Sequence, residues 1–384
     1  MKILIAGDLV PTKSNEDMFI NADIKSLLGE ELFSLWYSVD IRIFNLETPI
    51  TNQITPISKC GPNLFASLDT IRGIKELNPS VITLANNHIF DQGIPGFIST
   101  RDILQKSSIP FVGAGINLFD AKKPYVLNKD GIKVGVFNCT EHEFSIATDS
   151  IPGANPFDPI ESFDDIKELK DECDYVIVIY HGGKEHYRYP SPYIQKICKK
   201  MVQKGADIVV CQHSHCIGSF ENFNNSTIVY GQGNFVFDYS NSDFWQTSLL
   251  IKIEINEEFL IEYVPIIKEG NVVKLADESN KEEILSSFLS RSEEILREGF
   301  IEEKYKEFAD LNIETYIRNL SGLGKWLSRI DRYLLNGWLL GKIYNPQRLL
   351  AIRNHIECEA HRELLIAGLV NKGKSDRNDK QSKI

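Results

Sequence analysis

The stretch VVCQHSHCIG, residues 209–218, begins as an apolar run and ends with His213 and His215 between two cysteines. A short β-branched run bounded by polar residues predicts a buried strand. The imidazoles at its end could be metal ligands, core residues or part of a cysteine site. Because side chains alternate along a strand, Cys211 is expected to point into the core, and we interpret both cysteines as packing residues.

Five further runs of this kind precede it, and segments with helical spacing lie between them. Together with the run that ends in the opening stretch, the six runs are KILIAG (2–7), DIRIFN (40–45), VITLAN (81–86), KVGVFN (133–138), YVIVIY (175–180) and DIVVCQ (207–212). The covering helices are predicted at 67–77, 96–106, 161–171 and 191–204. This alternation is typical of an α/β sheet wrapped by helices. After about residue 225, the segments 227–237, 247–256 and 259–268 are too close together for intervening helices and predict antiparallel strands.

Polar residues that can bind a metal follow five of the runs. The carboxyl ends of parallel strands share one edge, so we assign these runs to one sheet and expect the polar groups to meet at one rim. They are Asp8, Asn45, Glu47, Asn86, Asn87, His88, His181, His213 and His215. Carboxylate, amide and imidazole ligands together suit Mn²⁺, Fe or Zn²⁺ better than Ca²⁺ or a thiolate zinc site. The pattern therefore predicts one or two divalent metal ions.

Each of these residues also has a simpler interpretation when it is taken alone. Asp8 would serve equally well as a helix cap, and Glu47 and Asn87 as turn residues. His181 alone would more often be a histidine with a local hydrogen bond. If each residue had only an unrelated local role, such residues would be found at both ends of the strands. Their shared position at one end therefore favours the metal hypothesis.

Composition limits the classes of partner and compartment. The chain has 384 residues, and its 42 Lys and Arg residues against 53 Asp and Glu residues give a net charge of −11, which disfavours nucleic acid. Seven cysteines without CxxC spacing argue against a disulfide framework. The apolar run in MKILIAGDLV is too short for a signal or a spanning helix, and no later one reaches about 18 residues. We therefore predict a cytoplasmic protein without a transmembrane segment.

The chain beyond about residue 280 has a helical pattern with aromatic and leucine stripes. We expect a main domain over 1–275, a helical extension over 276–370 and a disordered tail over 371–384, because the tail lacks an apolar stripe. The segment 326–344, WLSRIDRYLLNGWLLGKIY, could lie at a membrane surface. Packing on the main domain or on a second subunit is the favoured interpretation.

An ordered set of short motifs resembles a known family. The motifs are GD (7–8), NLE (45–47), NNHxxDxG (86–93), HGGxE (181–185), GAD (205–207), HSH (213–215) and YGQGNFVFD (230–238). Their order and spacing over about residues 1–240 are similar to those of the capsule-synthesis CapA family, within the calcineurin-like metallophosphoesterase superfamily. The resemblance implies a calcineurin-like metallophosphoesterase sandwich of mixed β-sheets flanked by helices, here with a C-terminal α-helical extension.

The resemblance also implies a role for each matching residue. Asp8 matches the aspartate that bridges two metal ions, and Glu47 matches the second acidic ligand. The remaining ligands implied are Asn87, His181, His213 and His215. His88 matches the histidine that assists the leaving group or the phosphoryl oxygens, and Asp91 would orient it. The chain departs from the superfamily pattern at two positions, because Val10 stands where a DxH motif has its histidine and Glu47 replaces an aspartate.

The function implied is that of a metal-dependent hydrolase acting on a phosphoester or an anionic polymer, linked to capsule or exopolymer biosynthesis of the poly-γ-glutamate type. Two alternatives stay open: a non-catalytic factor for capsule assembly or polymer binding, and a metal-dependent γ-glutamyl amide hydrolase or transferase. The C-terminal helices could then contact a second copy or a capsule-assembly partner. The residues expected to hold an anionic small-molecule or polymer substrate are Asn45, Asn86, Lys184, Glu185, Arg188 and Asn234.

Overall fold

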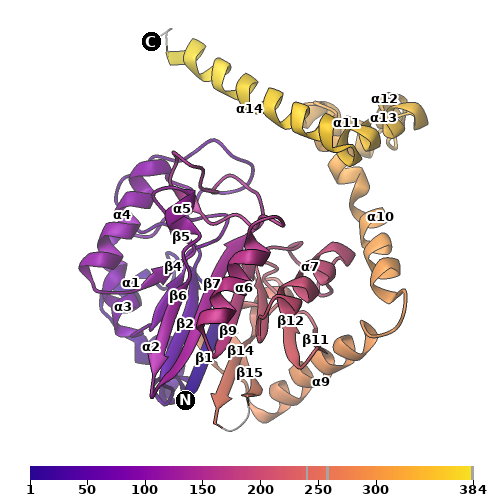
Figure 1. Cartoon of the computed structure of the whole chain (residues 1–384). Coiled ribbons are helices and arrows are strands. Elements are labelled where there is room, and N and C mark those ends of the chain that lie inside the picture. The colour runs from indigo at the N-terminus through magenta and orange to yellow at the C-terminus, as the bar shows by residue number, and fades with distance from the viewer. Residues whose placement is uncertain (239–240, 257–258, 382–384) are drawn as a thin grey trace. The chain divides into compact units, whose positions relative to one another are not determined.

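The computed structural model describes residues 1–238, 241–256 and 259–381 (Figure 1). The chain divides into two compact units, Met1–Tyr305 and Lys306–Ile384. The first unit carries all the motifs identified above.

Two mixed β-sheets form the centre of the first unit. The first has the order β16-β15-β14-β1-β2-β3-β4 with β13 also paired to β1, and the second has the order β11-β12-β10-β9-β7-β6. The strands of the first sheet are β1 (Lys2–Leu9), β2 (Ile41–Leu46), β3 (Val81–Thr83), β4 (Phe111–Val112), β13 (Asn234–Val236), β14 (Thr247–Ile255), β15 (Phe259–Glu269) and β16 (Val272–Leu275). The strands of the second sheet are β6 (Tyr125–Lys129), β7 (Ile132–Thr140), β9 (Tyr175–His181), β10 (Ile208–Gln212), β11 (Phe220–Phe223) and β12 (Ser226–Val229). A separate pair joins β5 (Ala114–Gly115) to β8 (Gly153–Ala154).

Alternation along the strands divides their apolar side chains between three layers. Ile3 and Ile5 of β1 face the inner core, where they meet Val136 of β7 and Ile177 and Ile179 of β9. The intervening residues face outwards against helices on either side of the sandwich. Both faces of each central strand are therefore buried, which explains why these runs are almost continuously apolar.

Helices cover both outer faces of the sandwich, with α2, α3 and α4 on one side and α6 and α7 on the other (Figure 1). The helices of this unit are α1 (Glu16–Ile20), α2 (Ile24–Tyr37), α3 (Ile71–Glu76) after a short 3₁₀ turn (Leu68–Thr70), α4 (Gly93–Lys106), α5 (Leu118–Ala121), α6 (Ser162–Glu172), α7 (Pro192–Gln203), α8 (Asp243–Gln246) and α9 (Glu278–Glu294). Ser191 caps α7 by accepting a hydrogen bond from the backbone N–H of Ile194, and Pro192 occupies its first turn. The four helices expected at 67–77, 96–106, 161–171 and 191–204 are all present, whereas α2 was not anticipated.

The predicted sandwich of mixed sheets with flanking helices and a helical C-terminal region is confirmed, but two details of the strand assignment were wrong. The six runs do not share one sheet, because β1, β2 and β3 belong to the first sheet and β7, β9 and β10 to the second. Strand β12 pairs antiparallel with β11 but parallel with β10, and β13 is parallel to β1, so the segment 227–237 is antiparallel to a neighbour only in its first part. Strands β14, β15 and β16 are antiparallel, as expected for the segments at 247–256 and 259–268.

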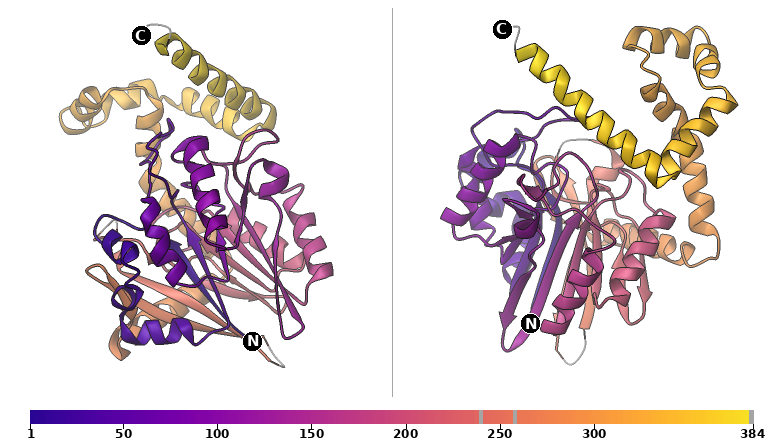
Figure 2. Two further views of the ribbon diagram at one scale, coloured as in Figure 1. Left: turned by 90° about the vertical axis from the view of Figure 1, so that its left-hand side faces the viewer. Right: turned by 45° about the horizontal axis from the view of Figure 1, so that its top comes forward.

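The two sheets place their central strands in the same direction, and this positions the site. β1 runs parallel to β2 and β3, and β9 runs parallel to β7 and β10. In Figures 1 and 2 the N-terminus marks the edge where β1 begins, and the carboxyl ends of these strands lie at the opposite edge. Loops from both sheets therefore meet there.

The helix α9 belongs to the first unit. Its Ile284 and Phe288 are buried in the core between the sheets, and Phe288 packs against Phe220 of β11 and Tyr263 of β15. The helical extension was expected from residue 276, but the second compact unit begins at Lys306. Burial of these two side chains explains the difference.

The second unit consists of helices. They are the greater part of α10 (Phe300–Leu320), then α11 (Lys325–Tyr333), α12 (Trp338–Ile343), α13 (Pro346–Glu357) and α14 (Glu359–Gln381). A buried ion pair joins Arg318 of α10 to Asp331 of α11 at 2.9 Å, and Asp331 also accepts a hydrogen bond from the backbone N–H of Leu339. Helix α14 includes residues 371–381 of the expected disordered tail, and residues 382–384 lie outside the described part. Among the described helices, none is both long and apolar enough to cross a membrane.

Candidate metal centre

Two buried carboxylates lie at the edge of the first sheet. Asp8 is the next-to-last residue of β1, and Glu47 directly follows β2. The Asn45 amide donates a hydrogen bond to Asp8 Oδ1 at 2.7 Å, and Asp8 Oδ2 lies 3.7 Å from His215 Nδ1. Glu47 Oε1 lies 3.2 Å from His181 Nε2. Both carboxylates are almost wholly inaccessible to solvent.

Three histidines reach the same place from the second sheet. His181 ends β9, and His213 and His215 follow β10. His213 Nδ1 lies 3.2 Å from His181 Nε2, which is itself 3.1 Å from the Asn87 side-chain oxygen. The backbone of His213 and His215 has φ values of 82° and 54°, a region that residues other than glycine seldom adopt. Such a conformation is often found at functional sites, and here it directs both imidazoles into the cluster.

The ligand atoms form two neighbouring groups that share one carboxylate. Asp8, Glu47 and His215 each place an atom within 4.8 Å of the others, and Glu47, His181 and His213 do the same. The shared residue is Glu47. Asp8, to which the motif resemblance gives the bridging role, lies 3.7 Å from His215 Nδ1 and 3.8 Å from His181 Nδ1, so it also lies beside both groups. The structure thus brings together all six predicted ligands, with Asn87 beside the second group.

Burial controls the charges of the cluster. It raises the pKa of Glu47 from 4.5 to about 8, and together with the charge of Glu47 it raises the pKa of Asp8 to about 7. Burial lowers the pKa of His215 to about 3 and holds those of His181 and His213 below their ordinary range. At neutral pH the imidazoles are therefore neutral and can offer a lone pair to a metal ion.

The hydrogen bonding of the Glu47 carboxylate indicates whether these residues suit a metal ion. Both of its oxygens are buried, and neither accepts a hydrogen bond from the residues that the structure describes. A buried carboxylate without such partners is costly unless a positive charge compensates it. A divalent cation between Glu47 and the neutral imidazoles would provide that charge, so the donor set fits the metal that the family resemblance implies.

A second cluster surrounds His88, which follows Asn87 in the loop after β3. His88 Nδ1 lies 2.6 Å from Asp91 Oδ2, and this oxygen also accepts a hydrogen bond from the backbone N–H of Leu64. The Lys59 ammonium contacts Asp91 Oδ1 and lies 3.2 Å from His88 Nδ1. The Lys59 side chain is only 2% exposed, so it forms a buried ion pair. Lys59 lies in an irregular loop, SKCGPN, that gave no signal in the sequence.

Three of the predicted substrate-binding amides are instead bonded within the protein. Asn45 donates to Asp8 and accepts from the Asn86 side chain at 3.0 Å. Asn86 also donates to the carbonyl of Leu46 and accepts from the backbone N–H groups of the 86–89 turn. Asn234 Oδ1 lies 2.8 Å from His215 Nδ1. All three are buried.

An apolar and aromatic wall closes the side of the cluster near Asp8. Val10 is buried in a small group with Phe237 and Trp245. The Trp245 ring stacks on the His215 ring with centroids 4.4 Å apart, and Trp245 Nε1 donates to His186 Nε2 at 2.8 Å. Where the superfamily has a histidine two residues after the first aspartate, this chain therefore has a packed apolar contact.

The rim holds the remaining predicted residues and two carboxylates that were missed, Glu141 and Glu143, which form a further group of possible ligands with His213. Lys184 is exposed and Glu185 is half-buried, whereas the Arg188 guanidinium donates to the carbonyl of Ile217. Glu141, directly after β7, lies 3.7 Å from His213 Nε2 and accepts a hydrogen bond from the backbone N–H of Gly183. Burial raises its pKa to about 7. The strand-end rule, applied to the run at 133–138, would have reached Glu141.

Two mixed sheets between helical layers, with a carboxylate and imidazole cluster at one edge, agree with the metallophosphoesterase-type sandwich that the motif resemblance implies. Residues 2–239 match the family described as bacterial capsule synthesis protein PGA_cap, and the chain belongs to that family.

Two curated relatives carry names from the same context. The chain is 33% identical over 221 residues to the capsule biosynthesis protein CapA of Bacillus anthracis, a match that covers 54% of this chain and 53% of that protein. It is 32% identical over 198 residues to the PGA biosynthesis protein CapA of Bacillus subtilis, covering 50% and 52% respectively. The chain thus spans about half the length of the curated relatives that it matches.

Solved structures are more distantly similar. The Haemophilus influenzae NAD nucleotidase shows a TM-score of 0.42 at 11% identity, over 76% of this chain and 56% of that one. A phosphatase of Mycoplasma pneumoniae shows a TM-score of 0.39 at 17% identity, over 71% and 90%.

Proposed function

We propose that this protein is a metal-dependent hydrolase of the metallophosphoesterase type, which acts on a phosphoester or an anionic polymer in capsule or exopolymer biosynthesis. The observation that carries the proposal is Glu47, a buried carboxylate that accepts no hydrogen bond from the described residues and is shared by two groups of ligand atoms. The neutral histidines around it and the adjacent His88 supply the other parts of a hydrolytic site.

The two groups would hold ions of unequal affinity. Glu47, His181, His213 and Asn87 make a complete set of oxygen and nitrogen donors. Asp8, Glu47 and His215 make a smaller set, because Val10 and Trp245 fill the adjoining space with apolar surface. Fewer protein ligands favour weaker binding. When bound, a divalent ion supplies Lewis-acid polarisation of the oxygen at the reacting centre and lowers the pKa of a water molecule.

His88 would exchange the proton with the substrate. Its Nδ1 is directed to Asp91, so the ring would act as an acid in its imidazolium form, which gives the Nε2 proton to a leaving oxygen and keeps the Nδ1 proton on the Asp91 side. The Lys59 ammonium balances the charge of Asp91, and the backbone N–H of Leu64 fixes the carboxylate position. The ring is therefore held in one orientation before a substrate arrives.

The buried amides would orient ligands rather than touch the substrate. Asn45 fixes one oxygen of Asp8, and Asn86 fixes Asn45 together with the turn that carries Asn87 and His88. Asn234 Oδ1, 2.8 Å from His215 Nδ1, would hold the orientation of the His215 ring. Lys184 and Glu185 remain the candidates for contact with an anionic substrate at the rim.

The experiment that tests this function measures metal content and turnover on the same protein. The chain is depleted with a chelator, loaded with Mn²⁺, Fe²⁺ or Zn²⁺, and offered an aryl phosphate monoester, a diester and a γ-glutamyl anilide. Metal-dependent release from a phosphate ester supports the proposal, whereas release only from the anilide would assign the site to amide hydrolysis. Metal retention without turnover of any substrate would contradict the enzyme and favour a polymer-binding role. Asp8→Asn serves as the metal-site control and Glu168→Gln, on the exposed face of α6, as the surface control.

A further inference from the structure

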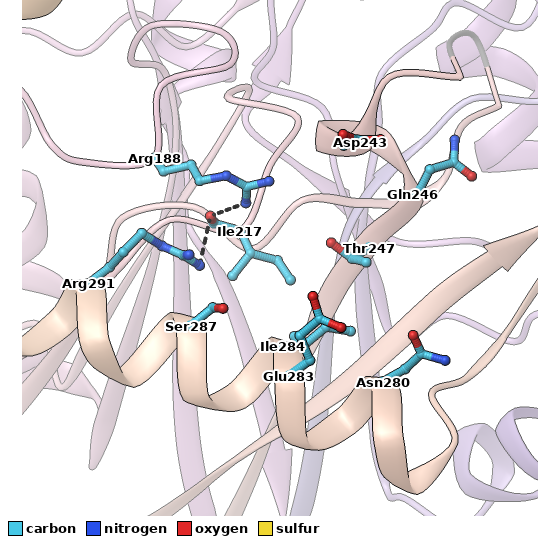
Figure 3. Close-up of a pocket in the computed structure, with 10 residues that line it drawn as sticks. All are labelled: Arg188, Ile217, Asp243, Gln246, Thr247, Asn280, Glu283, Ile284, Ser287 and Arg291. Carbon is cyan, nitrogen blue, oxygen red and sulfur yellow. Dashed lines mark hydrogen bonds between the residues drawn. The ribbon is translucent and has the colours of Figure 1, made fainter.

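A cavity lies behind the loop that carries His213 and His215. It has a volume of about 400 Å³ and lies between the loop at 217–218, the short helix α8 and the helix α9 (Figure 3). Its size is in the range of small-molecule sites in proteins. None of the predicted metal ligands lines it, and Arg188 is the single predicted site residue that does.

Two arginines converge on one carbonyl at one end of this cavity. Arg188 Nη1 donates to the carbonyl of Ile217 at 2.9 Å, and Arg291 Nη2 approaches the same oxygen at 3.4 Å (Figure 3). Arg291 Nε also donates to the carbonyl of Gly218 at 2.8 Å. Support of these two carbonyls is a structural role, but it uses only part of the donors that two guanidinium groups offer.

The positive charge of this pair is not balanced by a close carboxylate. Among the described residues, no Asp or Glu oxygen lies within 4.0 Å of either guanidinium, although both side chains are half-buried. Burial, with a further contribution from the charge of Arg188, lowers the pKa of Arg291, although Glu294 acts in the opposite direction. The Arg188 guanidinium rests on the Phe244 ring at 4.8 Å from its centroid. This end of the cavity is therefore suited to a planar anion such as a carboxylate.

The lining of the rest of the cavity includes side chains of negative charge. Glu283 rises from α9 into it, Asp243 lies on the wall formed by α8, and Asn280 lies at the end away from the arginines (Figure 3). Neither carboxylate forms an ion pair with a cation in the described part of the chain. A ligand that bound only as an anion would be repelled by these two groups. A ligand with an ammonium group beside its carboxylate would satisfy both ends.

We propose that this cavity is a binding site for a small zwitterion of the amino-acid type, with its carboxylate on Arg188 and Arg291 and its ammonium group toward Glu283. The site is distinct from the metal centre and does not depend on the proposed hydrolysis. Helix α8 separates the two, because its Phe244 faces Arg188 while the next residue, Trp245, stacks on His215.

The test is calorimetric titration of the full chain after removal of metal with a chelator, so that binding at the metal centre does not contribute. Glycine, L-glutamate and L-lysine are the zwitterionic probes, and acetate, methylammonium and inorganic phosphate each offer only one kind of charge. We expect saturable binding of at least one amino acid, at least about tenfold tighter than acetate or phosphate.

Matched variants locate the site. Arg188→Gln should weaken amino-acid binding by about tenfold or more, and Glu283→Gln should abolish the preference over acetate. Glu283 is exposed on α9, so its variant should fold even if the arginine variant does not. Arg297→Gln and Glu282→Gln, which change exposed residues outside the cavity, should bind as the unmodified chain does.

Three outcomes would overturn the proposal. They are an absence of saturable amino-acid binding, equal affinity for phosphate or acetate, and binding that is unchanged by Glu283→Gln in a folded protein.

Discussion

The substitution Glu47→Gln should stabilise the metal-free protein at alkaline pH and remove its response to metal. Glutamine keeps the volume and shape of the side chain but carries no charge. The pKa of Glu47 rises from 4.5 to about 8 in the folded chain, and each pKa unit corresponds to about 1.4 kcal/mol. Above pH 8 the ionised carboxylate therefore destabilises the folded metal-free protein by about 5 kcal/mol relative to the unfolded chain.

The sign of the pH dependence follows from the raised pKa. The folded chain holds the Glu47 proton more tightly than the unfolded chain, so the favourable contribution is present below pH 4.5 and is lost as pH rises to about 8. Asp8, whose pKa is about 7, adds a loss of the same sign. The buried histidines, whose pKa values are lowered, contribute a change of the opposite sign below about pH 6.5, and this change is common to both proteins. Relative to the glutamine variant, the metal-free unmodified chain should therefore lose stability between pH 5 and pH 9.

The assay is urea or thermal unfolding of chelator-treated protein at pH 5 and pH 9, with and without Mn²⁺. At pH 9 the variant should exceed the unmodified chain by about 5 kcal/mol in free energy of unfolding. Mn²⁺ should stabilise the unmodified chain and leave the variant unchanged. Glu168→Gln is the control, because its side chain is exposed on α6. Equal stability of the two proteins at pH 9, or a full Mn²⁺ response in the variant, would refute the assignment of Glu47 as the shared ligand.

Three further predictions address the neighbouring residues. His88→Ala should lower turnover by about 10²- to 10⁴-fold, as expected for loss of a general acid, and should leave the metal content measured by mass spectrometry nearly unchanged; loss of metal would instead make His88 a ligand. Protein purified without added metal should carry closer to one ion than two per chain, because apolar contacts of Val10 stand beside the smaller ligand group; titration of the apoprotein that finds two equally tight ions would contradict this. Lys59→Met should lower the free energy of unfolding by about 3–5 kcal/mol, since it removes the ammonium partner of the buried Asp91 carboxylate. Adding Asp91→Asn to that variant should restore part of the loss in denaturant unfolding, and strictly additive effects would show that the two side chains are not coupled.

Much of the candidate site could be predicted because its residues come at the ends of recognisable strands. Asp8, His181 and His213 each follow or end an apolar run, and chain direction alone sends such residues to one edge of a sheet. This rule applies whichever sheet a strand joins. The six runs belong to two sheets and not to one, but the expected convergence of their carboxyl ends is found in the structure.

The partners within the site could not be predicted. Lys59 comes from an irregular loop without periodicity, and its burial against Asp91 depends on how that loop folds over the edge of the sheet. The role of Glu47 as the shared carboxylate depends on distances across two sheets, which sequence spacing does not contain. The pair of Arg188 and Arg291 likewise joins residues about a hundred positions apart in sequence, through the packing of α9.

The sequence by itself determined the periodicities, the strand ends and the chemical kinds of ligand, because these depend on local spacing and on residue type. Tertiary structure alone decided which strands pair, which carboxylate is left without hydrogen bonds, and where buried charges find partners. The physical reason is that burial and electrostatic interaction depend on distance in space. In this chain, the decisive contacts around Glu47 join segments that are far apart in sequence.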